Sequence, residues 1–158
     1  MDKKLKVQQS KNGLGVFAQK PIKPGQIILE ITGNIVHWQD LLKIGGIILD
    51  NTYRFDEHNY LSPDGIGNYF NHSCEPNSGV VKQGNKLFLK AIKKIQAGDE
   101  IAFDYSTIVG GDDSWTMKCL CGMSACRKKV TNFYKLPSDI RTKYLELGIV
   151  PKYIIRSK

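Results

Sequence analysis

The sequence predicts one mainly β domain with short helices, and three observations support this. The chain has 158 residues, the length of a single domain. Short runs rich in β-branched and aromatic residues recur along it, separated by glycine, proline or asparagine turn signals. Apolar residues with helical spacing occur near the C-terminus. Many short strands with turns between them indicate a fold of small β-sheets.

The strand candidates are spread over the first two thirds of the chain. In chain order they are residues 7–10, 16–18, 27–31, 35–36, 53–55, 60–61, 79–81, 86–91 and 101–103. The glycine-bearing turn Asn12-Gly13-Leu14-Gly15 separates the first two candidates. Gln83-Gly84-Asn85 separates residues 79–81 from 86–91, which is a good signal for a β-hairpin.

Two short helices are expected. Residues 38–43 form the first, which ends at Gly45-Gly46. The second begins at Ser138, a favourable N-cap residue, and stops at Gly148 and Pro151. One face of this second helix carries its apolar side chains, Ile140, Tyr144 and Leu147.

The charge balance is basic. A net charge of +8 suits either a polyanion partner such as DNA or a nucleosome, or only a soluble basic surface, and the sequence leaves both open. A basic protein that acts on a basic peptide needs a local acidic patch, for which the candidates are Asp56, Glu57, Glu75, Asp112 and Asp113. No apolar run reaches membrane-spanning length and no signal peptide is evident, so we expect an intracellular protein.

The cysteines predict a metal site. Cys119, Cys121 and Cys126 form a C-x-C-x4-C cluster, which leaves a tetrahedral zinc ion one ligand short. The fourth cysteine of the chain, Cys74, lies in the polar stretch Asn71-His72-Ser73-Cys74. One Zn²⁺ bound by four thiolates would use every cysteine and would fix the C-terminal cluster against this stretch.

Several motifs occur in one order that resembles a known family. Residues 71–77 (Asn-His-Ser-Cys-x-Pro-Asn) and Glu100-x-x-x-Asp104-Tyr105 resemble the SET domain of protein-lysine methyltransferases, and the cysteine cluster resembles its post-SET zinc motif. Residues 13–18 resemble the opening cofactor turn, and residues 30–33 a changed Tyr-x-Gly element. The resemblance implies a β-clip-like fold of small sheets with a pseudoknot. It divides the chain into a SET domain (6–107), a post-SET segment (117–133) and a C-terminal helical extension (134–158).

The implied reaction is transfer of a methyl group from S-adenosylmethionine to a lysine ε-amine of a protein, such as a histone or histone-like tail. By resemblance, Tyr105 and Asn71 are the catalytic residues. Tyr53 and Phe103 line the substrate channel, and a phenylalanine at position 103 predicts that di- or trimethylation is possible. The residues expected to bind the cofactor are Asn12, Gly13, Leu14, Gly15, Tyr53, Asn71, His72 and Leu120. The location would be the nucleus or chromosome in a eukaryote and the cytoplasm in a bacterium.

The sequence also departs from the family pattern. Leu14 stands where relatives often have tryptophan, Ile31 and Asn34 replace residues of the Tyr-x-Gly element, and residues 68–70 differ from the common Arg-Phe-Ile. Two other function classes therefore stay open: a catalytically silent SET module that binds a partner, and a zinc-stabilised DNA-binding protein. His72 and Tyr53 could equally be structural residues of the core.

Overall fold

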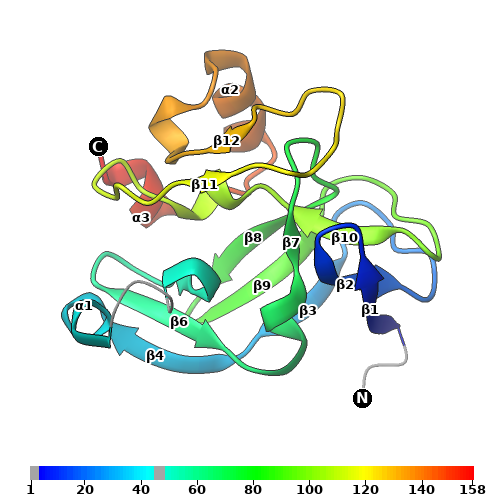
Figure 1. The fold of residues 1–158 in the computed structure, drawn as a ribbon, viewed down its shortest axis with the longest axis horizontal. Helices are drawn as coiled ribbons and strands as arrows, with labels where there is room; N and C mark the ends of the chain where they lie inside the picture. Colours follow the sequence, from blue (N-terminus) through cyan, green and yellow to red (C-terminus); the bar gives the residue numbers. More distant parts are fainter. Residues whose placement is uncertain (1–3, 45–48) are drawn as a thin grey trace.

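The computed structural model describes residues 4–44 and 49–158, and these form the mainly β fold of small sheets that the sequence predicts (Figure 1). The strands are β1 (Leu5–Ser10), β2 (Gly13–Ala18), β3 (Ile27–Ile31), β4 (Gly33–His37), β5 (Tyr53–Arg54), β6 (Asn59–Pro63), β7 (Asn71–His72), β8 (Ser78–Gln83), β9 (Lys86–Ala91), β10 (Glu100–Phe103), β11 (Met117–Lys118) and β12 (Lys129–Val130). The α-helices are α1 (Trp38–Ile44), α2 (Ser138–Glu146) and α3 (Lys152–Arg156). Single 3₁₀ turns are η1 (Leu49–Asn51), η2 (Gly65–Tyr69), η3 (Tyr105–Ile108) and η4 (Phe133–Lys135). None of the described helices is long and apolar enough to span a bilayer.

The largest sheet has the strand order β1-β2-β10-β8-β9-β3. Strand β10 is central to it: it pairs antiparallel with β2 and parallel with both β7 and β8. The parallel pairing brings residues 71–77 beside residues 100–105, although about 30 residues separate them in the sequence. The two motifs that resemble a SET site therefore lie side by side, while the pseudoknot itself stays a prediction.

Two smaller sheets lie beside the large one. Strands β4, β6 and β5 form an antiparallel sheet at the lower left of Figure 1, next to α1. Strands β11 and β12 form a two-stranded ribbon above the large sheet, and the cysteine-rich loop connects them.

The apolar core has one main cluster and one C-terminal cluster. The main cluster fills the space around the large sheet and contains fully buried residues such as Val16, Leu89 and Ile101. The C-terminal cluster holds α2 and α3 against Val81 of β8. Its burial explains why residues 134–158, here called the C-terminal extension, pack on the domain: apolar side chains gain stability when they leave water.

The helices agree with the sequence predictions in part. The three apolar residues expected on one face of α2 do pack in the C-terminal cluster, and the helix ends before Gly148, which has a φ of 63°. The expected N-cap was wrong, because Ser138 is the first helical residue and Pro137 occupies the cap position. A third helix, α3, follows Pro151 and was not predicted from the sequence. The predicted end of the first helix at Gly45-Gly46 falls outside the described residues.

Candidate functional site

Tyr105 lies where the parallel strands β7 and β10 end. Its hydroxyl donates a 2.7 Å hydrogen bond to the Phe70 carbonyl, and its backbone N–H donates to His72 Nδ1 at 3.2 Å. Burial raises the pKa of the Tyr105 phenol, and the nearby charge of Glu100 raises it further. The phenol is therefore a neutral hydrogen-bonding group at pH 7 and not a base.

A narrow aromatic cavity of about 50 Å³ opens beside Tyr105. The Phe103 ring lies 4.9 Å from the Tyr105 ring and 5.6 Å from the Tyr53 ring, measured between centroids. The Tyr53 hydroxyl is fixed by a 2.8 Å hydrogen bond to the Gly67 carbonyl. Aromatic faces thus line one part of a slot whose other lining residues include Asp50, Asn68 and Asp113, so the slot suits a long side chain with an alkyl stem and a polar end.

The rim of this cavity contains two residues that the sequence analysis missed. Trp115 Nε1 donates a 2.6 Å hydrogen bond to Asp50 Oδ1, and both residues line the cavity. This contact joins the loop after η3 to the turn η1. Sequence patterns gave no signal for it, because neither residue belongs to a motif or a periodic segment.

A second cavity, of about 320 Å³, lies on the other side of β7. Asn12, Asn71, His72 and Cys121 contribute to its wall, whereas Phe70 lines the aromatic cavity. The short segment 70–72 therefore separates the two cavities.

Asn71 connects the glycine-bearing turn to β10. Its Nδ2 donates to the Leu14 carbonyl at 3.0 Å and to Glu100 Oε1 at 2.7 Å. Gly15 is needed here because a Cβ atom at that position would overlap the Glu100 carboxylate and lie 3.0 Å from Asn71 Nδ2. Ser10 Oγ donates to the other Glu100 oxygen at 2.7 Å. The sequence analysis assigned no role to Ser10 or Glu100.

The turn also contacts the cysteine-rich loop. Asn12 Nδ2 donates a 3.0 Å hydrogen bond to the Leu120 carbonyl. The side chains of Leu14 and Leu120 are exposed, at 47% and 58% of their surface. Exposed leucines on two segments that touch offer apolar surface to a ligand, which agrees with the position expected for a cofactor-binding turn.

The four cysteines come together as predicted. Cys119 Sγ lies 3.7 Å from Cys74 Sγ and 3.6 Å from Cys126 Sγ, and Cys121 packs in the same cluster. Sulfurs around a tetrahedral zinc ion are about 3.8 Å apart, because each Zn–S bond is about 2.3 Å long. The spacing of this donor set therefore fits a zinc ion.

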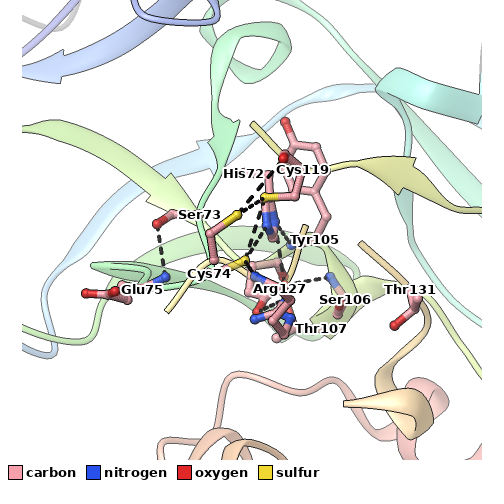
Figure 2. Close-up of polar contacts among 12 residues, drawn as sticks. His72, Ser73, Cys74, Glu75, Tyr105, Ser106, Thr107, Cys119, Arg127 and Thr131 are labelled. Carbon is pink, nitrogen blue, oxygen red and sulfur yellow. Dashed lines mark hydrogen bonds and ion pairs between the residues drawn. The ribbon is translucent and has the colours of Figure 1, made fainter. Parts of the chain in front are cut away.

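His72 is also near enough to bind a metal, since it lies within 4.8 Å of Cys74, Cys119 and Cys121 (Figure 2). Its Nδ1 accepts the hydrogen bond from Tyr105, so its Nε2 carries the proton in the neutral ring. Burial lowers the pKa of His72 to about 4, although the nearby Asp104 raises it, so the ring is neutral at pH 7. Nε2 lies 3.3 Å from Cys74 Sγ, where it can donate to the sulfur. The group of ligand atoms within 4.8 Å of one another thus contains His72 and not Cys126, whereas the proton on Nε2 argues for Cys126 as the fourth ligand.

Burial raises the pKa of the Cys74 and Cys119 thiols. Without a cation these two groups would stay protonated, since a buried thiolate is poorly solvated. A bound divalent ion reverses this preference and deprotonates the ligating thiols. Backbone N–H groups of Arg127 and Lys128 already point at Cys74 and Cys126, at 3.4 and 3.5 Å, as they would for negatively charged sulfurs.

The predicted acidic residues divide into two sets. Glu57, Asp112 and Asp113 line an open cleft of about 750 Å³ that shares Arg54, Tyr60 and Asp113 with the aromatic cavity. Asp56 accepts local hydrogen bonds from residues 58–59, and Glu75 accepts hydrogen bonds from residues 124–125 of the cysteine-rich loop and lines the second cavity. Three of the five candidates therefore lie in the cleft next to the aromatic cavity.

The model of one protein family matches much of this chain. The SET domain matches residues 13–106, which include the turn, the segment 71–77 and Tyr105. The chain belongs to the SET-domain family. The predicted resemblance is thus confirmed for this SET domain.

Relatives and a solved structure agree with the family. The chain is 29% identical over 139 residues to the Drosophila melanogaster histone-lysine N-methyltransferase Set2, covering 74% of this chain and 6% of that protein. It is 30% identical over 131 residues to the Drosophila histone-lysine N-methyltransferase trr, covering 73% and 5%. A crystal structure of a candidate histone methyltransferase from Plasmodium falciparum has a TM-score of 0.56 and 28% identity, covering 66% of this chain and 95% of that one. The chain spans only a small part of the length of the two Drosophila relatives.

Proposed function

We propose that the protein is an S-adenosylmethionine-dependent methyltransferase that acts on a lysine ε-amine of a protein. The observation that carries the proposal is that consecutive residues line the two cavities, Phe70 the aromatic one and Asn71 and His72 the other, and that the Tyr105 hydroxyl is bonded to the Phe70 carbonyl. An amine entering through the aromatic cavity and a methyl donor in the other would approach each other beside this segment. S-adenosylmethionine supplies the methyl group when bound.

The protein must provide a neutral amine. A free lysine has a pKa of about 10.4, so deprotonation at pH 7 costs about 4–5 kcal/mol. Tyr53, Phe103 and Trp115 replace water around the amine and so disfavour the ammonium form, while the carboxylates of Asp50 and Asp113 in the same lining attract the cation as it enters. The remaining task is to align the amine with the methyl group, and a narrow rigid slot contributes mainly by positioning.

Tyr105 and Asn71 are proposed as the catalytic residues. The Tyr105 hydroxyl donates its proton to the Phe70 carbonyl, so its oxygen lone pairs stay available to orient the amine and the methyl group. Asn71 fixes β7 against the glycine turn. Of the proposed cofactor contacts, Asn12, Asn71 and His72 line the second cavity, Tyr53 lines the aromatic cavity, and the others are Gly13, Leu14, Gly15 and Leu120 of the glycine turn and the cysteine-rich loop. The proposed channel residues are Phe103 and Tyr53.

One structural Zn²⁺ bound by Cys74, Cys119, Cys121 and Cys126 is also proposed. It would hold the post-SET segment (117–133) against the SET domain (6–107), with the extension (134–158) packed behind. The sulfur spacing described above supports this ligand set.

The proposed substrate is a basic peptide segment, such as a histone-like tail. The cleft next to the aromatic cavity contains three carboxylates against two arginines, one of which, Arg54, is paired with Asp112, so the cleft is more acidic than the rest of a protein of net charge +8. Such a local excess of negative charge favours a cationic peptide over the acidic proteins that the rest of the surface attracts. The proposed location is intracellular: on chromatin if the host is a eukaryote, in the cytoplasm if it is a bacterium.

A contact with nucleic acid is a secondary proposal, supported by one observation. Lys118 and Lys129 are direct cross-strand partners in the β11–β12 ribbon, and both are exposed. Like charges in directly opposite positions destabilise a strand pair, so an anionic partner such as phosphate would stabilise it. Lys118→Gln with Lys129→Gln should then reduce the salt dependence of DNA binding without changing methyl transfer to a free peptide.

Methyl transfer from labelled S-adenosylmethionine tests the main proposal. Wild type, Tyr105→Phe and the control Tyr134→Phe are incubated with core histones and with a total protein extract, in the presence of zinc. Tyr134 lies in the C-terminal extension and its hydroxyl contacts the Ile155 carbonyl. A band labelled by wild type and Tyr134→Phe but not by Tyr105→Phe supports the proposal. No labelled band despite measured cofactor binding supports the silent module, and salt-sensitive DNA binding without cofactor binding supports the DNA-binding class.

A further inference from the structure

The carboxylate of Asp104 is fully buried and connects three parts of the chain. Its Oδ1 accepts a 3.1 Å hydrogen bond from the Ser106 backbone N–H. Arg127 Nη2, from the cysteine-rich segment, lies 2.8 Å from Oδ1 and 2.7 Å from Oδ2. The Tyr144 hydroxyl, from α2 of the C-terminal extension, donates to Oδ2 at 2.9 Å. Figure 2 shows Arg127 next to the segment that carries Tyr105 and Ser106.

Asp104 is the N-cap of the turn η3, whose first residue is Tyr105. A capping carboxylate fixes the backbone N–H groups that follow it, so its orientation sets the direction in which the chain leaves the cap. The neighbouring Tyr105 is held at its other contacts by His72 and the Phe70 carbonyl. A shift of the Asp104 carboxylate would therefore change the backbone from which the Tyr105 phenol projects.

A buried carboxylate keeps one orientation only if its donors are fixed, because an unpaired charge away from water is costly. Tyr144 is a rigid donor: it is 2% exposed and packs in the C-terminal cluster with Ile149 and Ile154. Burial and the adjacent Asp104 raise the pKa of its phenol, so the hydroxyl keeps the proton that it donates. Arg127 is less buried, with 16% of its side chain exposed, and its position depends on the cysteine-rich segment.

We propose that Tyr144 is a positioning residue for the active site, which acts on Tyr105 through the carboxylate of Asp104. The C-terminal extension is then a functional part of the domain and not only a cover for β8. The inference rests on the proposed function for its kinetic consequence, but the structural link from Tyr144 to Tyr105 can be tested without turnover.

The test compares Tyr144→Phe with Tyr134→Phe. Both remove one tyrosine hydroxyl from the C-terminal extension, but the Tyr134 hydroxyl contacts only the Ile155 carbonyl and no residue of the Asp104 network. In protein with ¹³C-labelled tyrosine rings, the Tyr105 resonance is assigned from its absence in Tyr105→Phe. We expect this resonance to shift in Tyr144→Phe and to stay unchanged in Tyr134→Phe.

The kinetic readout separates positioning from folding. We expect kcat to fall about tenfold in Tyr144→Phe, the effect of one lost hydrogen bond to a charged group, with KM for peptide and cofactor nearly unchanged. If Tyr144→Phe does not fold, Arg127→Lys replaces it in the test. This variant weakens the ion pair between Arg127 and the Asp104 carboxylate and should give the same shift of the Tyr105 resonance and the same loss of kcat. An unchanged Tyr105 resonance in the folded variant overturns the inference. A shifted resonance in an inactive wild type overturns only the proposed function.

Discussion

Replacing Gly15 by alanine tests whether the lack of a side chain at this position is what lets the Glu100 carboxylate bind Asn71. Gly15 is not among the residues with positive φ, so alanine fits its backbone conformation. The new Cβ would instead overlap the Glu100 carboxylate. That carboxylate must then leave the hydrogen bonds from Ser10 and Asn71, each 2.7 Å long.

The structure gives the size of the effect. A hydrogen bond to a charged group contributes about 1.5–3 kcal/mol, and both bonds are only partly buried, so the lower value applies to each. The expected loss is about 3 kcal/mol of unfolding free energy, which lowers the melting temperature of a domain of this size by roughly 6–12 °C. The affinity for S-adenosylmethionine should fall by about tenfold or more, since Asn71 loses one of its two contacts.

Thermal unfolding and calorimetric titration with S-adenosylmethionine measure both effects, and a double-mutant cycle identifies their cause. In a Glu100→Ala background the overlap is absent, so Gly15→Ala should cost little. In a Glu100→Gln background the side chain keeps its size, so the cost should persist. If Gly15→Ala costs the same, within about 0.5 kcal/mol, in the wild-type and Glu100→Ala backgrounds, the steric explanation is wrong.

Three further predictions concern the metal, the channel and pH. Cys126→Ser should lose the single equivalent of bound zinc, whereas the control Ser124→Ala should keep it. A chelator should lower the melting temperature of the wild type by at least roughly 10 °C. Less than half an equivalent of zinc in reduced, freshly purified wild type would contradict the four-thiolate site. Phe103→Tyr should restrict products to monomethyl-lysine by narrowing the channel, whereas mass spectrometry of exhaustive wild-type reactions should show di- or trimethyl-lysine. Burial lowers the pKa of His72 to about 4 in the folded chain, whereas in the unfolded chain it is about 6.5. Between these values only the unfolded chain binds the proton. The unfolding free energy should therefore be greatest above pH 6.5 and fall by up to about 3 kcal/mol as the pH is lowered to 4. At constant bound metal, His72→Gln should flatten this dependence; an equally steep one would exclude His72 as its source.

The sequence predicted the parts of the site that are carried by local motifs. The segment 71–77, the stretch ending at Tyr105 and the cysteine cluster are each contiguous, and each contains residue types that are unusual outside binding or catalytic sites. Nine of the described strands were also predicted, because alternating apolar residues between turn signals identify them without knowledge of their partners, whereas the short strands β7, β11 and β12 were missed.

The sequence did not predict contacts in which at least one partner lies outside every motif. Asp50 and Trp115 meet across 65 positions, and Tyr144 meets Asp104 across 40. Such pairs depend on which elements pack together, and neither residue type nor spacing encodes that. The role of Glu100 was missed for a similar reason. Its carboxylate occupies the space that a side chain at position 15 would fill, and a glycine in the sequence does not indicate which residue lies beside it.

The central claim is that the methyl group crosses between the two cavities beside the Tyr105 hydroxyl. Single-turnover transfer to histone protein from labelled S-adenosylmethionine already bound to the protein tests it most directly, because it separates chemistry from cofactor binding. We predict that Tyr105→Phe slows this step by about a hundredfold or more while the Kd for the cofactor changes little. Equal transfer rates in the two proteins would contradict the claim and would remove Tyr105 from the mechanism.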